Sequence, residues 1–194
     1  MNIRLLPALG SICLLLTTPV HSAPALPDAP KLVVGVMVDQ MRPDYVYRYW
    51  DLFGDDGFKR LVNEGFSFTH MHFDYMPTAT GPGHSGVYSG TVPAVHGVMG
   101  NSWYVRELDR SINVIEVPGY EGVGSRPGRE GNKAPSNLIT TTVGDELRLH
   151  TNMRSRVVSI SRKDRSAILM GGHLGDAYWY ESATGNFVTS SYYR

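Results

Sequence analysis

Three apolar runs in the chain have the residue patterns of β-strands. Residues 32–38 and 157–160 are continuous and rich in β-branched side chains, which is typical of strands buried on both faces of a parallel sheet. Residues 66–73 alternate apolar and polar positions, the pattern of a strand with one buried face. The pattern therefore predicts strands in both halves of the chain.

Helical periodicity fills the intervals between these runs. Residues 43–52 predict a helix with Pro43 in its first turn, and a second helical repeat ends at Gly65. A short helix follows a polar, glycine-punctuated turn at residues 77–83. An apolar stripe after Ser136 predicts a further helix and consists of Leu138, Ile139, Val143 and Leu147.

Two pairs of short apolar segments flank turn residues. Residues 103–105 and 112–115 predict one hairpin, and residues 177–180 and 187–193 predict a second. Residues 118–135 are rich in glycine and proline, and we expect a mobile loop there.

The order of these elements indicates the fold class. Strands alternating with helices predict an α/β fold with a parallel-rich sheet and helices on both faces. In such folds ligands bind beyond the carboxyl ends of the strands. Polar residues fall at those ends at Asp39, at residues 77–83 and at residues 163–165. We therefore expect the functional site to draw on these three segments.

The first residues have the features of a secretory signal peptide over residues 1–22. A short positive head precedes a mostly apolar run at residues 5–16, and small residues then allow cleavage before Ala23. The run is shorter than the roughly 20 residues that span a bilayer. Cleavage would remove Cys13, the single cysteine, so the mature protein would have neither a disulfide nor a thiol nucleophile. We expect a secreted or periplasmic protein without a stable membrane anchor.

Composition and charge exclude several functions. The chain has 194 residues, of which 42% are hydrophobic and 19% charged, the balance of a soluble globular protein. Lys plus Arg and Asp plus Glu each total 18, so the net charge is zero. No basic excess is available to hold a nucleic acid or an anionic membrane. Any anion must be bound by a few well-placed residues.

Asp39 and Thr80 are the first candidates for chemistry. A carboxylate that ends an apolar strand is well placed to bind a metal, although Asp39 taken alone fits a helix cap or a surface ion pair better. Thr80 precedes Gly81 and Pro82, where a helix can begin, so its hydroxyl would lie at the positive end of a helix dipole. Thr80 could be a nucleophile there, or it could simply cap the helix.

Three segments carry a resemblance to a known family. Residues 38–42, 77–84 and 96–101 resemble, in order and spacing, the opening of the nucleotide pyrophosphatase/phosphodiesterase branch of the alkaline phosphatase superfamily. The match covers nearly the whole mature chain. It implies that residues 23–194 form the amino-terminal part of an alkaline phosphatase-like catalytic domain, incomplete at its C-terminus.

The resemblance also implies roles for individual residues. Thr80 would be the nucleophile that forms a phosphothreonine intermediate, and Asp39 would be a ligand of one of two zinc ions. Asn101 would donate a hydrogen bond to a phosphoryl oxygen, whereas by itself it fits an ordinary Gly-Asn turn. A threonine hydroxyl is nearly inert at neutral pH, so Thr80 would also need contact with a metal.

Lys163 and Arg165 indicate the substrate class. Two cations that lie two residues apart at a strand end can reach two oxygens of one anion, although such a run can also be a solvated surface. The pair resembles that of threonine-nucleophile alkaline phosphatases, which hydrolyse monoesters. A monoester carries a doubly charged phosphoryl group, so extra positive charge favours it over a diester. We expect a small phosphate monoester as the substrate and an alkaline phosphatase as the enzyme.

The predicted metal site is incomplete in this sequence. A binuclear zinc site needs about three protein ligands per metal, and the sequence offers Asp39 and Thr80. None of the histidines lies in a cluster with binuclear spacing, and we assign them structural roles. The chain stops at Arg194 after a hairpin, and the family supplies further ligands from later sequence. We expect a fragment that is inactive and poorly folded by itself.

Two other functions remain open from the sequence. One is a phosphodiesterase or nucleotide pyrophosphatase of the same superfamily. The other is a non-catalytic secreted binding domain, if the polypeptide truly ends at residue 194. A sulfatase is less favoured, because formylglycine usually requires a cysteine or a suitably placed serine.

Overall fold

The computed structural model describes residues 30–194, so the predicted signal peptide at residues 1–22 and Cys13 lie outside the described residues. The chain divides into two units, residues 1–36 and residues 37–194. Residues 30–36 of the first unit are exposed and form neither helix nor strand.

The prediction of strands at residues 32–38 and 66–73 is wrong. Both segments lack regular structure, and neither pairs with any strand among residues 30–194. Their apolar side chains are exposed, with Val34 at 71% and Phe66 at 83%. Apolar patterning produces a strand only where neighbouring strands accept its backbone hydrogen bonds. The described residues provide no such neighbours for these two runs.

In the first half of the second unit, helices form in the segments where the sequence predicts them. Helix α1 spans Asp44–Arg48 and is followed by the 3-10 turn η1 at Trp50–Leu52. Helix α2 spans Phe58–Glu64 and ends at Gly65, as predicted. None of the three has a buried residue, so their apolar faces are not part of the core.

The second half of the unit contains a mixed four-stranded sheet. Its strands are β3 (Gly122–Val123), β4 (Val158–Ser161), β5 (Asp176–Glu181) and β6 (Asn186–Ser190), in the spatial order β3-β6-β5-β4. Strands β4 and β5 are parallel, whereas β5 with β6 and β6 with β3 are antiparallel. The α/β class is confirmed. Among residues 30–194, however, the sheet is mixed and not parallel-rich.

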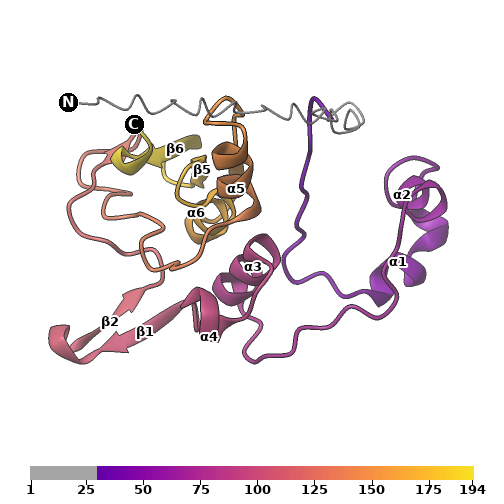
Figure 1. Cartoon of the computed structure of the whole chain (residues 1–194), viewed down its shortest axis with the longest axis horizontal. Coiled ribbons are helices and arrows are strands. Elements are labelled where there is room, and N and C mark those ends of the chain that lie inside the picture. Colours follow the sequence, from indigo (N-terminus) through magenta and orange to yellow (C-terminus); the bar gives the residue numbers. More distant parts are fainter. Residues whose placement is uncertain (1–29) are drawn as a thin grey trace, which may run out of the picture. The chain divides into compact units, whose positions relative to one another are not determined.

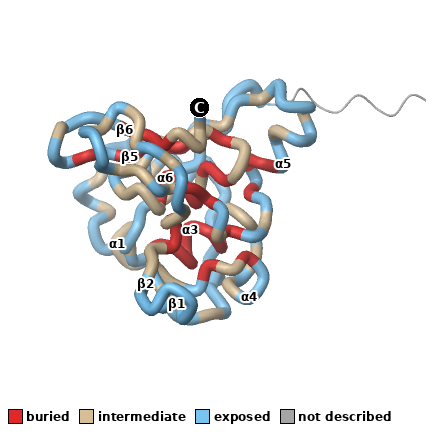
Figure 2. The backbone as a smooth tube through the Cα atoms, turned by 90° about the vertical axis from the view of Figure 1, so that its left-hand side faces the viewer, coloured by how far each residue is buried: buried red, intermediate tan, exposed pale blue. Residues whose placement is uncertain are grey.

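Helix α6 (Asp164–Gly171) connects β4 to β5 and packs on both. Helix α3 (Thr80–Ser89) and helix α5 (Val143–His150) pack against α6 in turn (Figure 1). Figure 2 shows the buried residues concentrated in these helices and strands. The buried apolar side chains that pack together as the core are Val98, Val114, Ile115, Leu138, Ala167, Ile168, Leu169, Ala177, Trp179 and Val188.

The helix predicted after Ser136 begins later than its apolar stripe suggests. Helix α5 starts at Val143 because Thr142 forms a capping box with Asp145: the Thr142 hydroxyl accepts from the Asp145 N–H, and the Asp145 carboxylate accepts from the Thr142 N–H. Leu138 lies in the segment before the helix and is nonetheless buried. The cap, rather than the hydrophobic stripe, sets where the helix begins.

The remaining elements follow the predicted hairpins. Strands β1 (Ser102–Val105) and β2 (Arg110–Asn113) form an antiparallel hairpin around the 3-10 turn η2 (Arg106–Leu108), and helix α4 (Pro93–His96) precedes it. The predicted second hairpin is β5–β6, followed by the 3-10 turn η3 (Ser191–Tyr193). The expected loop contains the short strand β3. Within residues 30–194 the structure contains no helix with the length and apolarity of a membrane span.

Candidate active site

Thr80 is the first residue of helix α3, and 8% of its surface is exposed. The N-cap position is occupied by the preceding residue, Ala79, whose backbone is extended. Thr80 therefore does not cap the helix through its side chain. Its hydroxyl lies at the positive end of a helix of 10 residues, where the dipole favours negative charge.

Asp39 and Lys163 meet at the Thr80 hydroxyl. Thr80 Oγ1 donates to Asp39 Oδ2 at 3.1 Å, and Lys163 Nζ donates to the same carboxylate oxygen at 2.9 Å. Lys163 Nζ also lies 3.5 Å from Thr80 Oγ1. Three sequence-predicted residues from distant segments thus form one cluster of a hydroxyl, a carboxylate and an ammonium group.

The cluster keeps Asp39 ionised. Burial opposes the charge on this carboxylate, but the hydrogen bond and charge of Lys163 and the hydrogen bond from Thr80 outweigh it. Together they hold the pKa of Asp39 below its ordinary value. Asp39 is therefore an anionic oxygen donor at neutral pH, which is the form that binds a metal.

Asn101 lies beside the first turn of α3. The Gly81 N–H donates to Asn101 Oδ1 at 2.7 Å, and because an N–H can only donate, this contact fixes the orientation of the amide. The Asn101 NH₂ group is then the part of the side chain left to donate to a ligand. A Cβ at position 81 would lie 2.9 Å from the Gly100 carbonyl oxygen, so this close approach requires glycine.

Arg165 follows Lys163 by two residues and lies in the first turn of α6, for which Lys163 is the N-terminal flanking residue. Its Nε is buried and has no hydrogen-bond partner among residues 30–194. Its contact with Asp164, at 4.0 Å, is long. A partly buried guanidinium with an unused donor is able to bind an anion.

His84 lies one turn after Thr80 and is 2% exposed. Its Nδ1 is 2.7 Å from the Thr80 carbonyl oxygen, which requires the proton to be on Nδ1. Burial lowers the pKa of His84, and the charges of Lys163 and Arg165 lower it further, while the Thr80 contact and Asp39 act in the opposite direction. The ring is neutral at pH 7 and ties its side chain back to the turn that carries the nucleophile candidate.

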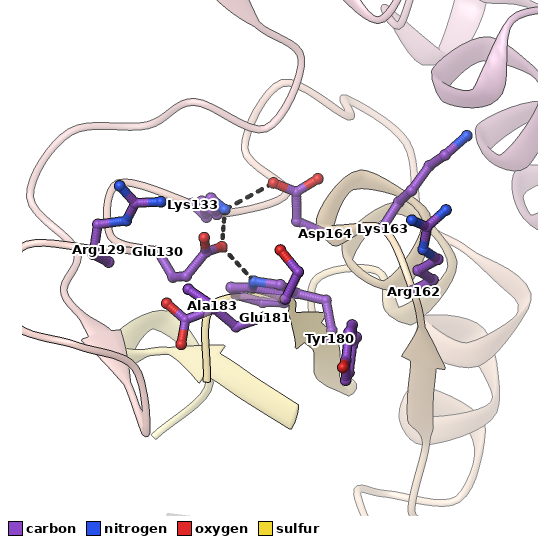
Figure 3. A pocket seen from close by; sticks show the side chains of 11 residues that line it. Arg129, Glu130, Lys133, Arg162, Lys163, Asp164, Tyr180, Glu181 and Ala183 are labelled. Carbon is purple, nitrogen blue, oxygen red and sulfur yellow. Dashed lines mark hydrogen bonds and ion pairs between the residues drawn. The ribbon is translucent and has the colours of Figure 1, made fainter. Parts of the chain in front are cut away.

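A second polar cluster adjoins the site on the far side of residue 163. Lys133 forms ion pairs with Glu130 and with Asp164, the latter at 2.8 Å, and Glu130 also accepts from the indole of Trp179 at 2.7 Å. These residues line a cavity of about 210 Å³ (Figure 3). Lys163 points away from this cluster in the figure. The Lys133 cluster therefore fixes the start of α6 and leaves the Lys163 ammonium free to reach Asp39.

The structure brings the predicted site residues together to different degrees. Asp39, Thr80 and Lys163 are in direct contact, and Asn101 is linked to Thr80 through its neighbour Gly81. Within residues 30–194, Arg165 forms no hydrogen bond or ion pair with any of these four residues. Sequence reasoning missed the hydrogen bond between Gly81 and Asn101 and the ion pair between Lys163 and Asp39. No local pattern could have revealed them, because each joins residues distant in sequence. The catalytic roles of these residues stay predictions.

The donor chemistry here is compatible with part of a zinc site. Zinc accepts carboxylate oxygen as a ligand, and a metal-bound hydroxyl loses its proton more readily. Asp39 and Thr80 offer these two oxygens side by side. Residues 30–194 contain no group of three or more His, Cys, Asp or Glu side chains placed to hold a metal. Asp39 and Thr80 could therefore supply two of the oxygen ligands of such a metal ion.

The fold and the cluster define a class of protein. The start of helix α3 brings together a hydroxyl, a carboxylate and a cation. Such a site can bind the oxygens of an oxyanion and present the hydroxyl to its central atom. Residues 33–127 match the sequence model of the type I phosphodiesterase / nucleotide pyrophosphatase family. Residues 33–127, just under half of the chain, thus carry the sequence pattern of this family.

Several similar proteins are named alkaline phosphatases. PhoV of Synechococcus elongatus is 51% identical over 165 residues, and PafA of Elizabethkingia meningoseptica is 47% identical over 165 residues. Each match covers 84% of this chain and 30% of the relative. The chain thus spans about 30% of the length of these curated relatives.

Crystal structures of PafA share the fold. The wild-type structure has a TM-score of 0.83 at 47% identity and covers 87% of this chain and 32% of PafA. A second structure, with a TM-score of 0.77 at 44% identity, covers 80% and 30%. It is a variant in which one threonine, one asparagine, one lysine and one arginine are replaced.

Proposed function

We propose that this chain supplies the nucleophile and the anion-binding residues of a zinc-dependent alkaline phosphatase, and that it acts as part of a longer polypeptide. The observation that carries the proposal is the buried Thr80 hydroxyl, which donates to Asp39 and lies 3.5 Å from the Lys163 ammonium. The names of PhoV and PafA support the same activity.

In the proposed reaction, Thr80 Oγ attacks phosphorus and the ester oxygen leaves as the alcohol, which gives phosphothreonine. Water then attacks the phosphothreonine and releases inorganic phosphate and the free hydroxyl. Two zinc ions, with Asp39 and Thr80 among their ligands, would supply the charge that activates the hydroxyl and stabilises the leaving oxygen. Asp39 accepts the Thr80 hydroxyl proton in a hydrogen bond, so the oxygen lone pairs are free to face the phosphorus.

The non-bridging oxygens of the substrate would be held by Asn101, Lys163 and Arg165. Gly81 holds the Asn101 carbonyl oxygen so that its NH₂ can donate, and Arg165 has an unused buried donor. The residues replaced in the PafA variant are of the same four types as Thr80 and these three, with the same intervals along the chain. Donors placed in advance around the phosphoryl group would stabilise charge in the transition state.

The nucleophile is tested by replacing Thr80 in the complete polypeptide. Thr80→Ala should lower kcat for a monoester such as p-nitrophenyl phosphate by about 10³-fold or more, because it removes the hydroxyl that is proposed to attack phosphorus. Thr80→Ser keeps a hydroxyl and is the matched control, which should retain activity. Wild-type-like turnover by the alanine variant would remove Thr80 as the nucleophile.

A phosphodiesterase is the second candidate, and the family description favours it. The two candidates differ in the charge of the phosphoryl group that they bind. The double change Lys163→Ala and Arg165→Ala should reduce kcat/KM for the monoester by about 10²-fold more than for bis-p-nitrophenyl phosphate, because a monoester carries the extra negative charge. Equal losses for both esters would favour the diesterase.

The proposed site of action is outside the cytoplasm. The proposal rests on the sequence of residues 1–22, which resembles a secretory signal peptide. Mass spectrometry of the N-terminus of the exported protein tests it, with cleavage before Ala23 as the expected result.

A further inference from the structure

The ion pair between Lys163 and Asp39 uses the oxygen that the proposed function assigns to a metal. Lys163 Nζ is 2.9 Å from Asp39 Oδ2 and 3.5 Å from Thr80 Oγ1. These two oxygens lie 3.1 Å from each other. The ammonium group therefore already contacts both proposed metal-binding oxygens of the chain.

We propose that Lys163 is an internal substitute for the metal: its ammonium group neutralises Asp39 while the site is free of metal, and an incoming zinc ion must displace it. This inference rests on the proposed function, since it takes Asp39 to be a zinc ligand. It adds that zinc and Lys163 compete for one carboxylate.

Competition follows from charge and distance. Zinc binds a carboxylate oxygen at about 2.0–2.2 Å, and an ammonium group that stayed in contact with the same oxygen would lie only a few ångströms from a divalent cation. Repulsion between the two cations is strong at such a distance when water is partly excluded. Lys163 can move away, because its side chain is 34% exposed and has a long flexible stem.

The ion pair with Lys163 also compensates the charge of the Asp39 carboxylate. This carboxylate is 31% exposed, and removing it from water is unfavourable unless a cation compensates. Among residues 30–194, Lys163 is the one cation that forms an ion pair with it. The Lys133 ammonium cannot take this place, because it is held by Glu130 and Asp164.

Displacement would link metal binding to substrate binding. The same ammonium group is proposed to hold a phosphoryl oxygen during the reaction, and it cannot contact Asp39 and the substrate in full at the same time. Zinc binding would therefore release Lys163 for the anion, and anion binding would in turn favour zinc. A protein without metal would keep its anion-binding lysine engaged.

Zinc affinity of the metal-stripped complete polypeptide tests the competition. Competition against a chromophoric chelator should show that Lys163→Met binds zinc about fivefold more tightly than the wild type, the size expected for losing a partly exposed ion pair. Arg165→Met is the matched control, since it removes one nearby positive charge but leaves the Asp39 ion pair intact. Its zinc affinity should change less than about twofold. An affinity of Lys163→Met equal to or below the wild type, or equal to that of Arg165→Met, would overturn the proposal.

Thermal stability gives a readout that is independent of affinity. In the metal-free protein, Lys163→Met and Asp39→Asn should each lower Tm, and the double variant should lower it no further than the more damaging single change. With zinc saturating, Lys163→Met should have no effect on Tm, because the ion pair is already broken. An equal loss of Tm with and without zinc would show a merely structural role for Lys163 and refute the competition.

The Asp39→Asn variant separates this proposal from the proposed function. If it binds zinc as tightly as the wild type, Asp39 is not a ligand and the metal assignment itself is wrong. If it binds zinc weakly while Lys163→Met matches the wild type, the metal assignment holds and the competition alone is refuted.

Discussion

Two stretches of the second unit differ sharply in how they are packed. Between residues 37 and 79 no side chain is buried, although the stretch contains helices α1 and α2 and many aromatic residues. From Thr80 onward, helices α3 and α6 and the sheet enclose a continuous core. The candidate site joins the two stretches, since Asp39 lies in the first and both Thr80 and Lys163 lie in the second.

This difference in packing means that the described residues fix some site residues more firmly than others. Thr80 and Asn101 are fixed by buried neighbours and by the Gly81 hydrogen bond. Asp39 is held by its contacts with Thr80 and Lys163, while the helix that follows it has no buried residue. Aromatic pairs such as Phe53 with Phe58 contact each other locally without joining the core. The first stretch is patterned for burial against a surface that residues 30–194 do not provide.

The largest expected effect compares one aromatic side chain from each stretch. Trp179 is 1% exposed in strand β5 and donates to Glu130, whereas Phe66 is 83% exposed. In the 194-residue chain, Trp179→Ala should lower the free energy of unfolding by about 3–5 kcal/mol. Phe66→Ala should change it by less than about 0.5 kcal/mol. Urea unfolding followed by circular dichroism measures both.

Equal losses from the two variants would mean that the comparison is wrong and that Phe66 is part of a core. The same two variants in the complete polypeptide give a sharper test. There a large cost for Phe66→Ala would show that the first stretch packs on sequence outside these residues.

The sequence predicts the elements of the second stretch well and those of the first less well. Strand β4 and the β5–β6 hairpin have partners close by in the chain, so their apolar patterns and their structure agree. Residues 32–38 have an equally strong pattern but no paired neighbour among the described residues. A hydrophobic pattern shows which face a segment would bury and leaves open whether a partner surface is present. The start of α5 was misplaced because a cap decides it.

The candidate site was predictable residue by residue but not as a set of contacts. Asp39, Thr80, Asn101 and the pair at residues 163 and 165 stand out in the sequence through strand ends, a helix start and a family resemblance. That Lys163 pairs with Asp39 follows from the tertiary packing of α6 against α3, which no local pattern records. The roles that the resemblance implies for these residues can be tested by substitution.

A smaller effect is expected at the start of α5. Asp145 is fully buried, and its carboxylate accepts from the Thr142 N–H and hydroxyl and from the Leu174 N–H at 2.7 Å. Asp145→Ala leaves these donors without an acceptor and should lower the free energy of unfolding by about 1–3 kcal/mol. Thr142→Ser keeps the capping hydroxyl and is the control, with a loss below about 1 kcal/mol. An unchanged urea midpoint for Asp145→Ala would show that the buried cap does not stabilise the second stretch.

The smallest expected effect concerns the dependence of stability on pH. Burial lowers the pKa of His84 in the folded protein below its usual 6.5, so just below pH 6.5 the unfolded chain binds more protons than the folded one. The free energy of unfolding must then fall as the pH drops from 6.5 through the pKa that His84 has in the folded protein. His96, whose pKa burial also lowers, contributes in the same sense. His84→Gln should therefore remove part of this acid loss, seen as a smaller change in urea midpoint between pH 7 and pH 5.5 than in the wild type. If the midpoint of His84→Gln changes with pH as much as that of the wild type, the imidazole beside Thr80 is not held neutral by the packed stretch. The contrast in packing between the two stretches then does not extend to the turn that carries Thr80.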